Sequence, residues 1–287
     1  MLDQAQRLRE MAMRDHMHKK PNGTKVITVT SGKGGVGKSN IVVNLSITLQ
    51  KMGKKVLIFD ADVGMGNDDV LMGFLPRYNI FDVIYNGKDI NDVIITGPYG
   101  VKLLPGGSGI AKINELSEEQ IDNFLLKLCN LNDLDYIIMD TGAGVNRSVL
   151  GFIACSDELV IVTTPEPTSL TDAYSLFKAV VHFKIKSNAK IIINRAFTHK
   201  EGVETYKKFA GVVNKFIKAE TEFLWSVSDD SKLVQAVRNQ KPVVISSPNC
   251  NASKDIEIIA KKIEGLTYGK NGVGIEGLFK KIFNIFS

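Results

Sequence analysis

The sequence predicts an α/β protein with a mostly parallel β-sheet and helices on both faces. Short, nearly continuous apolar runs recur along the chain, as is typical of strands buried on both faces of a parallel sheet. Helical patterns lie between these runs, and such alternation favours a single α/β domain. The chain has 287 residues, of which 44% are hydrophobic, so it can bury a substantial core.

The elements follow one another in a regular order. Strands are expected at residues 25–30, 55–60, 101–104, 136–140, 158–163 and 190–194. Helices are expected at residues 41–47, 121–129, about 168–183 and about 201–218. The helix at 121–129 follows Ser117-Glu118-Glu119-Gln120, in which Ser117 and Gln120 have the spacing of a capping box.

The chain divides into three parts by composition. Residues 1–22 form a polar segment, residues 23–267 the α/β domain, and residues 268–287 a glycine-rich linker with a final apolar helix. The net charge of +5 fits an anionic ligand or surface without demanding nucleic acid. The three cysteines form no C-x-x-C pair, so a zinc ribbon or a cysteine-ligated cluster is not indicated. With neither a signal peptide nor a long apolar run, we expect the cytoplasm as the compartment.

The stretch from Gly32 to Ser39 matches the P-loop pattern G-x-x-x-x-G-K-[ST] and lies between an expected strand and an expected helix. Glycines in such a loop let backbone N–H groups point at a phosphate. In this pattern Lys38 reaches the β- and γ-phosphates, and the Ser39 hydroxyl binds Mg²⁺. A second lysine, Lys33, follows the first glycine, and the plain pattern does not explain it.

Carboxylates stand at the ends of two expected strands. Asp140 follows four apolar residues, and its carboxylate is expected to hold Mg²⁺ directly or through water. Asp60 and Asp62 end the second strand, where a carboxylate can position the water that attacks the γ-phosphate. One strand-end aspartate alone is as well explained by a turn cap. Together, downstream of a P-loop, these residues indicate an ATPase site.

These motifs resemble those of the ParA/MinD family of P-loop ATPases. Residues 33–39 resemble its deviant Walker A motif, residues 60–67 its switch I, and residues 140–144 its switch II. The resemblance covers about residues 24–265, and it implies hydrolysis of ATP to ADP and phosphate with Mg²⁺. It therefore implies a P-loop NTPase fold.

The family resemblance assigns roles to single residues. Lys33 would reach across an ATP-sandwiched homodimer to the partner's phosphates, and Asp62 would orient the attacking water. Asn194, at the end of its strand, would contact adenine. The implied catalytic residues are Lys33, Lys38 and Asp62. The implied metal-site residues are Ser39, Asp60 and Asp140, the aspartates through water. The implied nucleotide-binding residues are Gly34, Gly35, Val36, Gly37, Lys38, Ser39, Asn40 and Asn194.

Within that family, the sequence is similar to the FlhG group of flagellar-number regulators in residues 3–9, in residues 164–174 and at Gly142. This similarity implies a nucleotide-switched regulator of flagellar number or placement. Its N-terminal segment, through Gln4, Arg7 and Leu8, would stimulate a partner GTPase of the FlhF type, which belongs to the signal-recognition-particle class. Flagellar C-ring components are further candidate partners.

Two other functions remain open. One is MinD-like control of the division site, against which residues 3–9 argue. The other is ParA-type DNA partition, which predicts salt-dependent binding to nonspecific DNA. The apolar C-terminal helix argues against partition, and no specific nucleic acid is expected as a partner.

Bulky apolar residues recur at spacings of three and four near the C-terminus, with lysines toward the opposite side. This pattern predicts an amphipathic helix of the kind that binds membrane surfaces. A helix docked on the core, or on another subunit, fits the pattern equally, but the targeting helices of the family favour the membrane. We therefore expect the ATP-bound dimer to bind anionic lipids on the inner face of the cytoplasmic membrane. The residues expected at the lipid are Leu278, Phe279, Lys280, Lys281, Ile282, Phe283 and Phe286.

Overall fold

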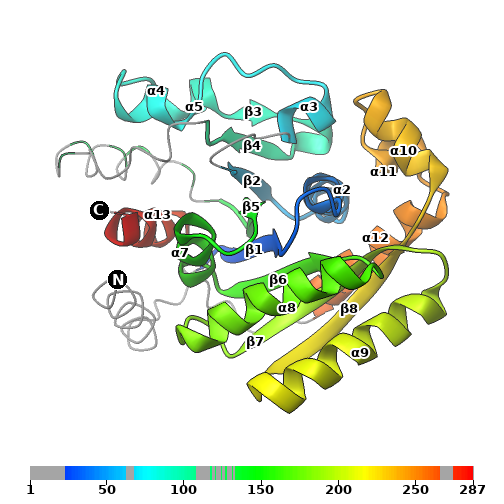
Figure 1. Ribbon diagram of the computed structural model, residues 1–287. Helices are drawn as coiled ribbons and strands as arrows, with labels where there is room; N and C mark the ends of the chain where they lie inside the picture. Colours follow the sequence, from blue (N-terminus) through cyan, green and yellow to red (C-terminus); the bar gives the residue numbers. More distant parts are fainter. Residues whose placement is uncertain are drawn as a thin grey trace.

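The computed structural model describes residues 23–62, 68–107, 117, 120, 124, 127, 131, 133–265 and 274–286. Over these residues the chain forms a layered α/β fold (Figure 1). The predicted role of Gln4, Arg7 and Leu8 falls outside the described residues, as do positions 63–67 of the expected switch I and most of the expected helix at 121–129.

An eight-stranded sheet has the order β3-β4-β2-β5-β1-β6-β7-β8. All neighbouring strands are parallel except β3, which runs antiparallel to β4. The strands are β1 (Lys25–Ser31), β2 (Val56–Ala61), β3 (Ile95–Thr96), β4 (Lys102–Pro105), β5 (Tyr136–Ala143), β6 (Glu158–Thr163), β7 (Asn188–Ala196) and β8 (Glu220–Ser228). The predicted mostly parallel sheet is thereby confirmed.

Helices cover both faces of the sheet, and two apolar clusters fill the space beneath them. One face is covered by α4 (Ile80–Ile84), α5 (Ile90–Val93), α7 (Arg147–Cys155), α8 (Pro167–His182), α9 (His199–Ile217) and α13 (Gly274–Phe286). The other is covered by α2 (Lys38–Lys51), α3 (Asp68–Met72), α10 (Ser231–Arg238), α11 (Val243–Ser246) and α12 (Asn251–Gly265). Because the central strands are buried on both sides, they lack an alternating polar pattern.

Local signals set several element boundaries. Asn146 caps α7 by accepting a hydrogen bond from the backbone N–H of Val149 at 2.9 Å. The predicted capping box is present, since Ser117 and Gln120 each accept a hydrogen bond from the other's backbone N–H. The expectations did not include β8, an edge strand in which a register shift interrupts the pairing with β7.

The C-terminal helix α13 lies beside α7 in Figure 1 and packs on the sheet. Leu278, Phe279, Ile282 and Phe283 are each at most 2% exposed. The ring of Phe279 lies 5.2 Å from that of Phe59 in β2. Four of the side chains predicted to contact lipid are therefore buried in this structure, so lipid contact requires the helix to leave its groove. Among the described residues, no helix has the length and apolar character needed to cross a bilayer.

Candidate nucleotide-binding site

The P-loop joins β1 to α2 through glycines that hold its backbone in the left-handed region. Gly35 has φ 77° and Gly37 has φ 89°, and residues with a β-carbon adopt such positive φ angles only at a cost in free energy. Gly37 directly precedes α2, and no side chain caps this helix. The first N–H groups of α2 therefore lack a side-chain acceptor, which is the arrangement that binds a phosphate.

Two P-loop glycines are also required by close packing. A β-carbon on Gly32 would lie 2.1 Å from the backbone of Asp172 in α8. A β-carbon on Gly37 would lie 2.3 Å from Asn194 Nδ2. Distances this short exclude any larger side chain without movement of α8 or β7. The loop is thus clamped between its own strand and two neighbouring elements.

Lys38 and Asp140 form a buried ion pair at the heart of the site. Lys38 Nζ donates to Asp140 Oδ1 at 2.5 Å, and the two residues are 8% and 1% exposed. Asp60 pairs directly with Asp140 in the register of β2 and β5. This pairing sets Asp60 beside the ion pair, so the two aspartates expected to hold Mg²⁺ lie together at the P-loop lysine.

The carboxylates of this cluster outnumber their counter-charges. Burial raises the pKa of Asp60 to about 7, and the nearby charge of Asp140 contributes to the rise. Asp68, the first residue of α3, is fully buried, and its pKa lies well above the usual range because of burial, Asp140 and Asp60. Lys38 acts in the opposite direction on both groups but does not compensate.

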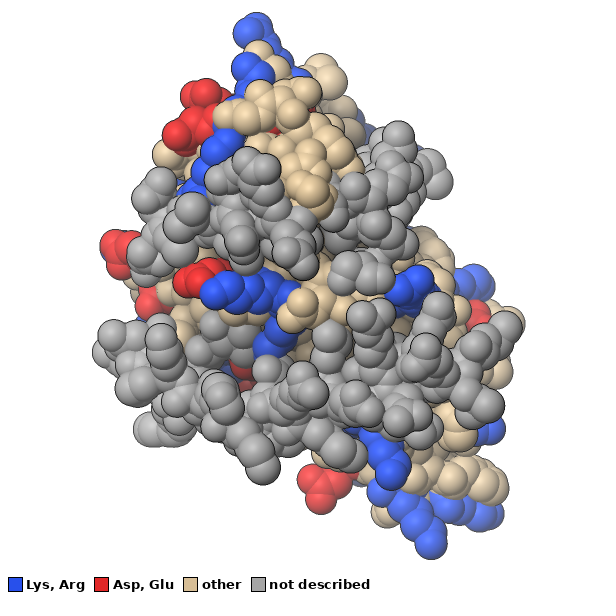
Figure 2. Space-filling view, turned by 90° about the vertical axis from the view of Figure 1, so that its left-hand side faces the viewer, with Lys and Arg blue, Asp and Glu red and all other residues tan. Residues whose placement is uncertain are grey.

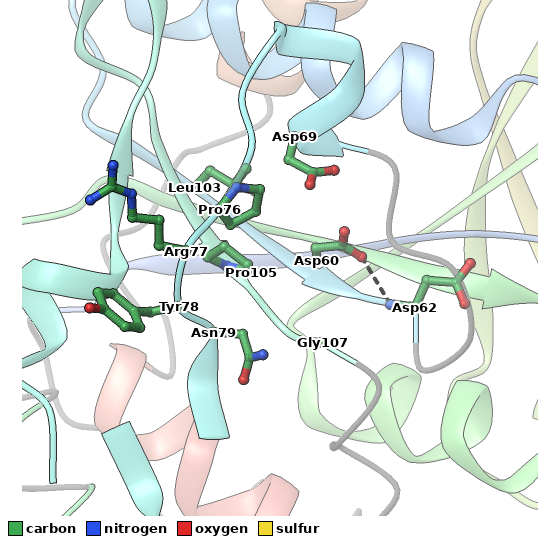
Figure 3. Close-up of a pocket in the computed structure, with 10 residues that line it drawn as sticks. All are labelled: Asp60, Asp62, Asp69, Pro76, Arg77, Tyr78, Asn79, Leu103, Pro105 and Gly107. Atoms are coloured by element: carbon green, nitrogen blue, oxygen red, sulfur yellow. Dashed lines mark hydrogen bonds between the residues drawn. The ribbon is translucent and has the colours of Figure 1, made fainter. Parts of the chain in front are cut away.

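Asp62, in the expected switch I, lies next to Gly142 of the expected switch II. Its backbone N–H donates to Asp60 Oδ1 at 3.2 Å, and a β-carbon built on Gly142 would lie 3.4 Å from Asp62 Oδ1. Asp60 and Asp62 line a pocket of about 180 Å³, in which Asp60 lies between Asp62 and most of the other lining residues (Figure 3). A second pocket joins Asp62 to Gly142 and Ala143. This position suits a group that orients a water near switch II.

Lys33 points over the start of α8. Its side chain is 44% exposed, with Nζ 3.3 Å from Thr168 Oγ1 and 3.7 Å from Glu166 Oε2. Both partners belong to residues 164–174, which carried part of the sequence resemblance. Sequence reasoning did not assign them a contact with the lysine.

Asn194 ties β7 to the P-loop. Its amide Nδ2 donates to the backbone carbonyl of Val36 at 2.7 Å, and the residue is 1% exposed. Its Oδ1 is buried without a hydrogen-bond partner. The expected contact with adenine stays a prediction, since in this structure the side chain supports the loop instead.

The donors at the site fit Mg²⁺. They are carboxylate oxygens and the Ser39 hydroxyl at the start of α2, the hard oxygen ligands that Mg²⁺ prefers. No donor group reaches the buried carboxyl oxygens of Asp68, and a cation bound nearby would favour the ionised form of this carboxyl. Bound there, Mg²⁺ would offset charge on the phosphates, while Lys38 and the α2 N–H groups would hold them.

Comparisons with known proteins agree with this geometry. A family model described as an AAA domain matches residues 24–193. The antiactivator FleN of Pseudomonas aeruginosa is 34% identical over 84% of this chain and 86% of its own length. The septum site-determining protein MinD of Thermotoga maritima is 32% identical over 88% of this chain and 91% of its own. The chain belongs to the ParA/MinD family of P-loop ATPases.

Other relatives extend the same similarity. The flagellum site-determining protein YlxH of Helicobacter pylori is 37% identical over 90% of both chains. A MinC:MinD cell division complex from Aquifex aeolicus has a fold similar to this chain, with a TM-score of 0.67, 28% identity, and coverage of 85% of this chain and 97% of that one. As a ParA/MinD ATPase, the protein binds ATP and hydrolyses it.

Asp68 is the site residue that sequence reasoning missed. It stands next to Asp69 at the beginning of a short helix, and a pair of aspartates in that position is typical of an ordinary helix start. Only the three-dimensional placement shows that Asp68 is buried beside Asp60, Asp140 and Lys38.

Proposed function

We propose that this ATPase is a nucleotide-switched regulator of flagellar number or placement. In this proposal it is a monomer when empty or ADP-bound and a membrane-bound homodimer with ATP. The names of FleN, an antiactivator, and YlxH, a flagellum site-determining protein, support the flagellar role. The similarity to each extends over most of both chains, so it is not confined to the P-loop.

The placement of Lys33 supports a role across a dimer interface. Its ammonium group is held by an exposed contact with Glu166 rather than by a buried partner. Exposed ion pairs contribute little, so Lys33 can leave Glu166 at small cost. At a neighbouring copy's γ-phosphate, a lysine would stabilise the charge that develops during hydrolysis. Hydrolysis would then require two copies.

The main observation in support of nucleotide-controlled membrane binding is that α13 is docked on residues next to both expected switch regions. Phe279 contacts Phe59, the residue directly before Asp60. Near the C-terminal end of the helix, Arg147 Nη2 donates to the backbone carbonyl of Ile285 at 3.2 Å. Arg147 begins α7, three residues after Gly144 of the expected switch II. A nucleotide-driven shift of the switches would therefore alter two contacts that hold α13.

A released α13 would expose large apolar side chains, and a lipid surface is the environment that would accept them. Lys280 already lies on the outer side, where it pairs with Glu276 at 2.5 Å. Lys and Arg side chains also lie across the middle of the face to which α13 belongs (Figure 2). One short helix binds weakly, so two helices in a dimer would bind the membrane by avidity.

The remaining parts of the proposal rest on resemblance. Residues 1–22 would stimulate an FlhF-type GTPase, and flagellar C-ring components would be further partners. Division-site control is a second candidate, favoured by the 32% identity with Thermotoga maritima MinD. Counting flagella and measuring cell length in cells that carry Lys33→Ala distinguishes the two roles.

The switch itself is tested by particle mass in solution. Wild-type protein is expected to double its mass with a non-hydrolysable ATP analogue and Mg²⁺ but not with ADP. Lys33→Ala is expected to stay monomeric with both, while Lys200→Ala, an 87% exposed lysine on α9, dimerises normally. Anionic vesicles should sediment only the dimer.

Two results would contradict the proposal. A Lys33→Ala protein that dimerises as wild type does would remove the lysine from the interface. Equal vesicle binding with ADP and with the ATP analogue would remove the membrane switch.

A further inference from the structure

Asp68 is a buried carboxylate to which the family resemblance assigns no role. It is 0% exposed, and no donor group reaches Oδ1 or Oδ2, although the Asp140 carboxyl can share a hydrogen bond with Asp68 once one of the two is protonated. An ionised carboxylate in such a place is strongly unfavourable unless another charge or a proton satisfies it. The residue therefore needs an explanation in the working state of the protein.

Its surroundings supply too little positive charge. Asp60, Asp140 and Lys38 all act on Asp68 electrostatically. The ammonium group of Lys38 is already bound to Asp140 at 2.5 Å. When all three carboxyl groups are ionised, their charge exceeds that of the single lysine by two. A divalent cation balances that charge.

We propose that Asp68 belongs to the Mg²⁺ site of this ATPase and holds a water molecule of the bound ion. Among the described residues, no set of three acidic, histidine or cysteine side chains could hold a metal ion by direct ligation. The proposal therefore uses contact through water, since Mg²⁺ usually keeps several of its waters and carboxylates can bind it through them.

The same placement links metal binding to phosphate binding. When Lys38 turns toward a phosphate, Asp140 loses its ion pair, and the three carboxylates then face one another without a lysine. Mg²⁺ is needed most at that moment. Asp68 thereby increases the dependence of ATP affinity on Mg²⁺, because its charge repels the phosphates when the ion is absent.

A proton shared between Asp68 and Asp140 is the competing explanation. It would satisfy the buried oxygens without any metal, since two carboxyl groups can form a hydrogen bond once one is protonated. In that case an asparagine at this position would leave metal affinity unchanged. The two explanations therefore differ in a direct binding measurement.

The test uses Mn²⁺ as a probe for the Mg²⁺ site, detected by electron paramagnetic resonance on the full chain. Asp68→Asn is expected to weaken Mn²⁺ binding by about 10- to 100-fold, the usual effect of removing a group that acts through a metal's ligands. ATP affinity should fall in Mg²⁺ but hold or rise in EDTA. Asp92→Asn is the matched control, because Asp92 is an exposed aspartate on α5 that lines neither pocket of the site, and it is expected to leave both affinities unchanged.

Wild-type Mn²⁺ affinity in Asp68→Asn would overturn the proposal. If that variant does not fold, Asp68→Ala serves for the same titration, and thermal unfolding in EDTA verifies that either variant is native. The inference rests on the ATPase site alone, not on the dimer or the membrane. Metal affinity is measured on nucleotide-free monomer, so its failure would be distinct from a failure of the proposed switch.

Discussion

Two charged clusters lie at opposite ends of the same sheet, and they differ in how their charges are matched. At the amino ends of the strands, Glu158 lies between Lys25 and Lys190, with Lys190 Nζ 2.5 Å from Glu158 Oε2. At the carboxyl ends, the carboxylates gather around Lys38. One cluster has two lysines for one carboxylate, and the other has one lysine for three carboxylates.

The pKa shifts of the two clusters run in opposite directions. Burial raises the pKa of Glu158, but hydrogen bonds from Lys190 and Lys25 outweigh it, so its pKa is lowered. Burial and Asp140 raise the pKa of Asp60 to about 7. This difference shows that the charge of the amino-end cluster is matched by side chains of the protein alone. The carboxylates of the carboxyl-end cluster are matched in charge only when a ligand supplies positive charge, as expected of a functional site.

The largest expected effect follows from removing the lysine of the carboxyl-end cluster. Lys38→Ala removes both the phosphate contact and the counter-charge of Asp140, so ATP hydrolysis is expected to fall by on the order of 10²- to 10³-fold. Steady-state phosphate release measures it. Lys190→Ala is the matched control at the amino end and should keep its turnover per folded molecule. An equal loss of ATP hydrolysis in both variants would contradict the functional difference between the two clusters.

A smaller effect is expected at the amino end, and it concerns stability. Glu158→Gln weakens two charge-assisted hydrogen bonds in a partly buried place and is expected to lower the free energy of unfolding by about 2 kcal/mol. Urea unfolding at neutral pH measures the loss. ATP turnover of the folded variant should match that of wild type.

The pH dependence of that effect follows from the sign of the pKa shift. The pKa of Glu158 in the folded protein lies below its usual value of 4.5, so the folded state favours the ionised form. Its stabilising contribution is present above that value and is lost as the pH falls through the folded pKa. The difference between wild type and Glu158→Gln should therefore shrink below about pH 4.5. A difference that grows in acid would contradict this origin.

Much of the fold could be predicted because the buried parallel strands lack polar residues. The runs that form β1, β2, β5 and β6 carry that signal directly, and their order places Asp60 and Asp140 at one edge. The P-loop was equally clear, since its glycines follow a short sequence pattern and Gly35 and Gly37 adopt the left-handed backbone conformation that such a loop needs. The strands and the P-loop are each determined by residues close together in the sequence, so they can be predicted from it.

Other features depend on contacts between distant segments. The apolar face of α13 fits a lipid surface and a protein surface equally, and long-range contacts such as that of Phe279 with Phe59 show which one it occupies in this structure. The burial of Asp68 depends on how α3 packs against α2 and β4, which no short-range pattern encodes. The hydrogen bond from Asn194 to Val36 joins residues 158 positions apart.

The most direct test of the contrast compares unfolding free energies at about pH 8 in EDTA without nucleotide. Asp60→Asn removes one carboxylate from the carboxyl-end cluster, in which carboxylates outnumber lysines. At about pH 8 the Asp60 carboxyl is ionised in wild type, because its pKa is about 7. This variant is expected to be more stable than wild type, whereas Glu158→Gln is expected to be less stable. Stability changes of the same sign would contradict the account, because both clusters would then serve the fold in the same way.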